Sequence, residues 1–426
     1  MKAIAIDSEP RSIYTVLFAT LWVLAVFSVL PTLCIDVKQT LSRSILMIGL
    51  VGLLLLLFDR GYLKKGMLSL IGTIGFFNTL STLSQVPVLG FKFNASWFFQ
   101  VFLWCGIIVI GFNAVSRGFS LKSLKPALLL IAFMALVHLL VGYAVSGYSG
   151  RTFLSVSWFM HESYHFVNRT GRFGFDKVGL VFLFHSLLIL LWPWLERHWR
   201  FILAILAVSY PLILGSKTAL LGLAVIGGCL LIYTRHTYAA RIMTLLFILP
   251  ATVSTLALFW VPISKFALMK GRYLAPVFSS TEFYKYPFGF GAGQYTHVAR
   301  NNLLQVSLHH EPLLLMSKIH SGRYEGHAYG LYPAAESDIL WFGVSFGWVF
   351  LALMLCFFSY LVFRYVIIQK SSKPENSTSA FLVIYFIASG LFQDHIQNQA
   401  TLVVVTTALA YLMNCNSVST THRRPP

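Results

Sequence analysis

Acidic side chains are scarce in this sequence: 14 Asp and Glu stand among 426 residues, and charged residues of both signs make up 11%. Soluble globular proteins carry roughly 25% charged residues, so the composition excludes an ordinary soluble enzyme. The 5 cysteines show no paired spacing, which argues against a disulfide framework and against a cysteine-based metal site. No small-x-small cleavage site follows the first apolar run, so we expect an uncleaved first span there.

Apolar runs are abundant instead, and hydrophobic residues make up 57% of the chain. A helix needs about 20 apolar residues to cross a hydrocarbon core of about 30 Å. The runs predict an all-α polytopic membrane protein of about 12 transmembrane helices, a single integral membrane domain over residues 1–426. The predicted spans are 13–34, 44–58, 67–86, 97–112, 126–146, 177–195, 200–215, 217–233, 242–261, 338–363, 379–393 and 399–414.

The net charge of +18 is distributed singly between the apolar runs, which favours orienting loop charges and argues against a nucleic-acid partner. With the N-terminus inside, every inner segment is basic, whereas the short outer segments hold mainly Lys38, Arg43 and Lys92. This asymmetry predicts that both termini are cytoplasmic. The inner basic residues are Lys2, Arg11, Arg60, Lys64, Lys65, Arg117, Lys122, Lys125, Arg197, Arg200, Arg235, Arg241, Arg364, Lys370, Lys373, Arg423 and Arg424.

Two outer segments are long or charged. One covers about 146–176, and the other, 262–335, is a large loop between the ninth and tenth predicted spans. Loops longer than about 15 residues in a compact protein are usually functional or disordered. We therefore expect the functional site on the outer face.

Basic residues at that face form the first candidate site. Arg169 and Arg172 precede the sixth span, and Lys217 stands between two apolar runs at the outer end of a tight hairpin. Guanidinium and ammonium groups at a membrane edge suit an anionic, lipid-borne substrate. The alternative for each is an interfacial side chain that extends its charge to water.

Glycines in Pro287-Phe-Gly-Phe-Gly-Ala-Gly-Gln294 superficially resemble a phosphate-binding loop. No strand-turn-helix context is visible, so a nucleotide site is not expected. The alternative is a tight turn in which glycine permits close backbone approach.

Carboxylates stand where the large loop enters the tenth span. Glu336 could act as a base on a sugar hydroxyl, and Asp338 suits the cap of the helix that follows. Asp394 and His395 form a further polar cluster between the last two spans, expected to line the site. The outer histidines match no zinc spacing, so we expect no metal.

Four blocks together resemble the O-antigen polymerase and ligase superfamily. They are Arg169-Thr-Gly-Arg172, Gly-Ser-Lys-Thr-Ala-Leu-Leu-Gly-Leu at 215–223, Phe288-Gly-Phe-Gly291 in the long loop, and Ala335-Glu-Ser-Asp-Ile-Leu-Trp-Phe-Gly343 with Ser345-Phe-Gly347. Their order and sidedness agree over about 145–400, while the first five spans match only in kind.

The resemblance implies a membrane glycosyltransferase of the GT-C-like type in the bacterial inner membrane, without cofactor. Its substrate would be an undecaprenyl-diphosphate-linked oligosaccharide, and a chain-length regulator is a conceivable partner. Arg169, Arg172 and Lys217 would hold the diphosphate, with Arg272 or Arg323 as closing cations. Glu336 would deprotonate the acceptor hydroxyl, with Asp338, Asp394 and His395 in support.

Two departures from the family pattern bear on the activity. Lys217 replaces the Arg of many members, which keeps the charge and loses the bidentate fork. Ligases typically carry His before a small polar residue where this chain has Glu336-Ser337, which favours a polymerase. The alternatives are a ligase that joins glycan to lipid A-core, a flippase or transporter with discontinuous helices and a polar midplane, and a structural or assembly protein.

Overall fold

The computed structural model describes residues 12–29, 35–58, 65–85, 95–145, 177–213, 217–246, 286–291, 338–368, 373–390 and 399–414. These residues form an all-helical bundle, and no strand occurs among them. The helices are α1 (Ile13–Val29), α2 (Ile35–Phe58), α3 (Lys65–Gln85), α4 (Ala95–Ser116), η2 (Leu121–Leu124), α5 (Lys125–Val145), α7 (Lys177–Leu191), η3 (Trp192–Trp194), α8 (Arg197–Ile213), α9 (Lys217–Tyr233), α15 (Asp338–Leu361), η5 (Val362–Ile367), α16 (Pro374–Gly390) and α17 (Gln399–Asn414).

A helix stands at almost every predicted span. The exception is the ninth, 242–261, where residues 238–246 are helical and 247–261 lie outside the described residues. Within the described part of the chain, 4 helices are long and apolar enough to cross a membrane: Gly66–Leu83, Ala95–Ser116, Leu121–Leu140 and Ser345–Ile367. Large apolar side chains face outward, including Leu140 and Phe201 with 68% and 69% of their surface exposed. Such outer faces suit lipid, so the protein is associated with a membrane.

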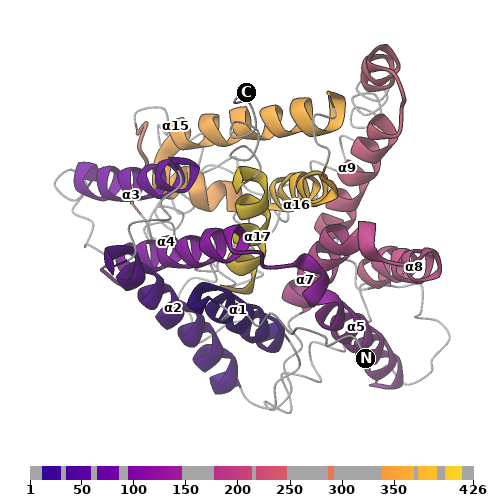
Figure 1. Ribbon diagram of the computed structural model, residues 1–426, viewed down its shortest axis with the longest axis horizontal. Helices are drawn as coiled ribbons and strands as arrows, with labels where there is room; N and C mark the ends of the chain where they lie inside the picture. The colour runs from indigo at the N-terminus through magenta and orange to yellow at the C-terminus, as the bar shows by residue number, and fades with distance from the viewer. Residues whose placement is uncertain are drawn as a thin grey trace, which may run out of the picture.

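The helix α17 occupies the centre of the bundle, between α1, α4, α7 and α16 (Figure 1). The indole Nε1 of Trp22 in α1 donates to the Thr407 hydroxyl in α17 over 3.2 Å. A Cβ at Gly111 of α4 would meet the Phe18 ring and the Thr406 methyl, so these helices are in close contact. The first and the last helices therefore share one core.

Small residues bring α2 and α4 together. The glycines Gly49 and Gly52 of α2 face Gly106 of α4, and a Cβ on any of them would meet backbone oxygen of the other helix. Association of helices in lipid relies on such close backbone packing, because lipid tails offer no hydrophobic driving force.

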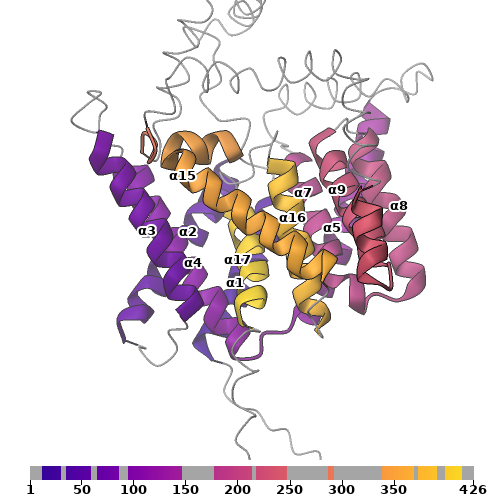
Figure 2. The same ribbon diagram turned by 90° about the horizontal axis from the view of Figure 1, so that it is seen from above.

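The helix α15 is broken at Gly347, whose φ of 82° and ψ of 178° are non-helical. Figure 2 shows its first part lying across one end of the bundle and its second part descending obliquely among the helices. The apolar run Ser345–Ile367 passes through this break, so its regular helix begins after Gly347.

The turn 286–291 fills the break. In an unbroken helix the Val349 N–H would donate to the Ser345 carbonyl. Here Val349 donates to the Pro287 carbonyl over 3.2 Å, and Ser345 accepts from the Gly291 N–H over 3.0 Å. Both groups keep a partner, which a membrane interior requires.

This turn contains the glycines that superficially resemble a phosphate-binding loop. Gly289 and Gly291 have φ of 76° and 90°, and a Cβ on Gly289 would lie 2.5 Å from the Gly347 nitrogen. The expectation of a tight turn with close backbone approach is confirmed, and the backbone it approaches is that of α15.

Candidate functional site

The predicted site residues fall mainly outside the described part of the chain: Arg169, Arg172, Arg272, Arg323, Glu336, Asp394 and His395. Two are placed by their backbone. Lys217 is the first residue of α9, and Asp338 is the first residue of α15, so a helix begins at Asp338 as the sequence predicts. For Arg172 and Asp394, which lie outside the described part, the nearest described helix ends in sequence are the start of α7, which follows Arg172, and the end of α16, which precedes Asp394.

A buried hydrogen-bonded cluster shows that these helix ends lie at one end of the bundle. The His185 ring in α7 bonds the Tyr385 hydroxyl in α16 over 2.7 Å and the Ala207 carbonyl in α8 over 2.8 Å. The Tyr385 ring also lies against Gly222 of α9, where a Cβ would be 2.6 Å from its Cε2.

The four residues of this cluster, His185, Ala207, Gly222 and Tyr385, lie at similar distances from one end of their helices. At 1.5 Å per residue they lie about 8 to 12 Å from the start of α7, the end of α8, the start of α9 and the end of α16. The four helix termini therefore converge, and we call the place where they meet the Lys217 end of the bundle. The segments that contain Arg169 and Arg172, and Asp394 and His395, begin or end there.

The start of α15 belongs to the same end. Its continuation η5 finishes at Ile367, whose carbonyl accepts a 2.7 Å hydrogen bond from Nη1 of Arg241. The Nε of Arg241 also donates to the Arg235 carbonyl over 2.8 Å, just after α9 ends. Because η5 finishes where α9 finishes, Asp338 starts α15 at the end where Lys217 starts α9.

The two described residues that flank 292–337, the part of the chain with Arg323 and Glu336, both lie toward this end. They are Gly291, which is bonded to Ser345, and Asp338. Seven residues of helix separate Asp338 from Ser345, or about 10 Å. The helix break thus holds these two flanking residues near each other.

The opposite end, which we call the basic end, holds most of the described cations. Arg117 lies 4.6 Å from the Tyr14 ring centroid, and the Tyr411 hydroxyl donates to the Phe119 carbonyl nearby. These contacts join the start of α1, the end of α4 and the end of α17. Among described lysine and arginine side chains, only Arg43 lies near the other side, on the first turns of α2.

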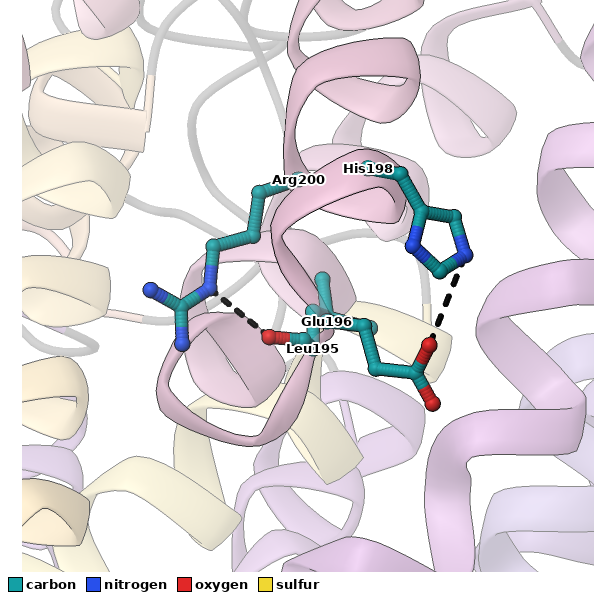
Figure 3. Close-up of polar contacts among 4 residues, drawn as sticks. All are labelled: Leu195, Glu196, His198 and Arg200. Atoms are coloured by element: carbon teal, nitrogen blue, oxygen red, sulfur yellow. Dashed lines mark hydrogen bonds and ion pairs between the residues drawn. The ribbon is translucent and has the colours of Figure 1, made fainter.

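Arg200 illustrates what these cations do (Figure 3). Its Nε donates to the Leu195 carbonyl over 2.8 Å. Its Nη2 donates to the Pro193 carbonyl over 3.1 Å, and the two bonds close the turn between η3 and α8. The nearby His198 and Glu196 are 3.5 Å apart and largely exposed, so that pair adds little stability. Arg200 and Arg241 bind backbone carbonyls, and their role is to hold helix ends together.

The cluster around His185 was not assigned a role from the sequence, although His138 and His185 stand out as histidines within apolar runs. A second pair joins the Nδ1 of His138 in α5 to the Tyr210 hydroxyl in α8 over 2.8 Å. The sequence did contain one indication of the cluster around His185: Pro211, within an apolar run, leaves a helix carbonyl without its usual N–H donor. No group of three or more metal-ligating side chains occurs among the described residues.

Comparison of the chain with protein-family models, with curated proteins and with solved structures gave no match.

Proposed function

We propose that this chain is a polysaccharide polymerase of a bacterial inner membrane, a multi-pass glycosyltransferase of about 12 transmembrane helices. It would transfer an undecaprenyl-diphosphate-linked glycan to the hydroxyl of an acceptor sugar on the periplasmic side. The GT-C-like fold, the cytoplasmic termini and the independence from metal are parts of the same proposal.

The observation that carries the proposal is the convergence of helix termini at the Lys217 end. The helices α9 and α15 both begin at that end, and the helices that flank the segments with Arg169, Arg172, Asp394 and His395 begin or end there. The described arginines at the basic end include two that bind backbone carbonyls, so they serve structure. Cations and carboxylates at one membrane edge suit a lipid diphosphate and a sugar hydroxyl.

The chemistry follows from these groups. Arg169, Arg172 and Lys217 would hold the diphosphate, with Arg272 or Arg323 closing over it. Glu336 would take the proton of the acceptor hydroxyl, whose oxygen attacks the anomeric carbon while lipid diphosphate leaves. Cations that neutralise charge developing on the leaving group stabilise the transition state. Because the donor is already activated, no nucleotide is required.

The broken helix α15 is the one observation that favours a transporter, since discontinuous helices are typical of that class. In transporters the break lies near the midplane and exposes backbone groups to substrate. The first part of α15 lies across one end of the bundle (Figure 2), so the break at Gly347 is close to that end, and its backbone groups are bonded to the turn 286–291. This arrangement favours the enzyme.

Replacing Lys217 by alanine is expected to reduce chain extension by about 100-fold or more, the usual cost of losing a group that stabilises developing charge. Lys217→Arg should retain activity, because it keeps the charge and matches the residue in many members of the O-antigen polymerase and ligase superfamily, which this chain resembles. Lys122→Ala at the basic end is a control for loss of a lysine. Wild-type chain lengths in Lys217→Ala, measured by gel electrophoresis of the glycan, would contradict the assignment.

Glu336→Gln is expected to slow polymerisation by roughly 100-fold or more, since it removes a general base without changing size. Asp338→Asn should cost far less, because an amide still caps a helix. The chain-length distribution in complemented cells measures both. If the two variants behave alike and retain the wild-type rate, Glu336 is not the base.

The polymerase and ligase activities differ in what a deletion strain accumulates. Loss of a polymerase leaves a single repeat unit on the lipid A-core. A bare core with long lipid-linked polymer would instead identify a ligase. If lipopolysaccharide from the deletion strain gives the wild-type ladder of chain lengths on a gel, the chain has neither activity and the proposed function is wrong.

A further inference from the structure

Pro211 lies in the last turn of α8, inside a buried part of the bundle. Proline has no N–H, so the carbonyl four residues earlier loses its helical donor, and the ring pushes that carbonyl aside. The carbonyl in question belongs to Ala207. An unpaired carbonyl in a membrane interior costs several kcal/mol, so it needs a donor from elsewhere.

His185 of α7 is that donor. Its Nε2 lies 2.8 Å from the Ala207 oxygen and its Nδ1 lies 2.7 Å from the Tyr385 hydroxyl. A carbonyl only accepts, so the ring proton resides on Nε2 and Nδ1 must accept from the tyrosine O–H. Both ring nitrogens are thereby satisfied in the neutral imidazole, which suits a side chain with no exposed surface.

The replacement of the missing backbone donor by the His185 side chain links several helices. The Tyr385 ring is held in turn by Gly222 of α9 and stacks on Phe182 of α7, with ring centroids 5.8 Å apart. Four helices, α7, α8, α9 and α16, thus meet around one histidine. Their termini form the Lys217 end.

We propose that His185 and Tyr385 are positioning residues that set the Lys217 end for diphosphate binding, an inference that rests on the proposed function. Neither residue touches the reacting atoms. The His185 bond to Ala207 holds the last turn of α8, and Tyr385 ties α16 to α9, the helix that begins at Lys217.

The test is a double-mutant cycle with its own rescue. His185→Phe removes the donor, leaves the Ala207 carbonyl unpaired, and should lower the melting temperature of the purified protein and shorten the polymer made in cells. Pro211→Ala supplies a backbone N–H to the same carbonyl. Combined with His185→Phe, it should recover about half or more of both losses, because one of the two lost bonds is restored.

His138→Phe is the matched control. It removes another buried histidine that bonds α8, but its partner is the Tyr210 hydroxyl, so Pro211→Ala should not rescue it. Membrane levels of every variant are measured by immunoblot so that polymer length is compared at equal protein. A rescue of His138→Phe equal to that of His185→Phe would overturn the proposal.

The remaining outcomes separate this inference from the proposed function. If Pro211→Ala rescues neither melting temperature nor polymer length, the His185 role is wrong whatever Lys217→Ala does. If His185→Phe at equal protein makes wild-type polymer while Lys217→Ala does not, the positioning role fails and the proposed function stands. If Lys217→Ala itself makes wild-type polymer, the proposed function fails and the positioning role fails with it, even where the melting temperatures show rescue.

Discussion

Replacing Gly347 by alanine is expected to destabilise the protein by about 3 kcal/mol or more, because its φ of 82° with ψ of 178° is open essentially only to glycine. The added Cβ would also meet the Pro287 carbonyl oxygen and the Gly289 nitrogen. The turn 286–291 would have to leave the break, and Val349 would lose the partner that replaces its helical one. The melting temperature of the detergent-solubilised protein measures the effect.

Gly228→Ala is the matched control for this substitution. Gly228 lies inside α9 with nothing within 4 Å of an added Cβ, so alanine should be neutral or gain about 0.5–1 kcal/mol from helix propensity. A Gly347→Ala protein with the same melting temperature as the wild type would show that α15 is not broken at this residue.

Gly106→Leu is expected to separate α2 from α4. A Cβ at Gly106 would meet the Gly49 carbonyl oxygen, and the leucine side chain would also press on Leu53. Overpacking of a tight contact costs about 1–3 kcal/mol when neighbours can shift, and backbone against backbone offers no such relief. We expect the substituted protein to be recovered in folded form at a small fraction of the wild-type yield, measured by size-exclusion chromatography.

Gly72→Leu provides the comparison for Gly106→Leu. Gly72 lies on an exposed face of α3 with nothing within 4 Å of an added Cβ, so leucine there would face lipid. Equal yields of the two variants would mean that α2 and α4 do not pack through Gly49, Gly52 and Gly106.

Helix positions were largely predictable from hydropathy, because the apolar runs are long and separated by charge. The helix α2 begins at Ile35, whereas the predicted span begins at 44. Lys38 and Arg43 interrupt the apolar run but not the helix, since backbone hydrogen bonding does not depend on apolar side chains. Hydropathy therefore locates the apolar runs but not the ends of the helices.

The break in α15 could not have been predicted from local sequence. Span 338–363 reads as one continuous apolar run, and a glycine within it does not by itself end a helix. The break depends on the turn 286–291, which supplies hydrogen bonds to Ser345 and Val349 from a segment about 60 residues earlier in the chain. The presence of Gly289 and Gly291 was visible, but not the helix against which they pack.

The candidate site was predictable in part. Charge asymmetry identified one face, and the structure brings the starts of α9 and α15 to the same end of the bundle. The contact between His185 and Ala207 was not predicted, because it requires knowing that α7 lies beside α8 at Pro211. Most of the predicted site residues remain predictions, since they lie outside the described residues.

The contact between α1 and α17 has a consequence for biosynthesis. Trp22 bonds Thr407 across 385 residues of sequence, and Tyr411 bonds Phe119 across 292. The helices inserted first therefore lack these hydrogen-bond partners in the bilayer until the last helix, α17, has been synthesised and inserted. A nascent chain that stops before Gln399 would leave the centre of the bundle vacant, so quality-control proteases should recognise truncated chains by these uncovered faces of α1 and α4.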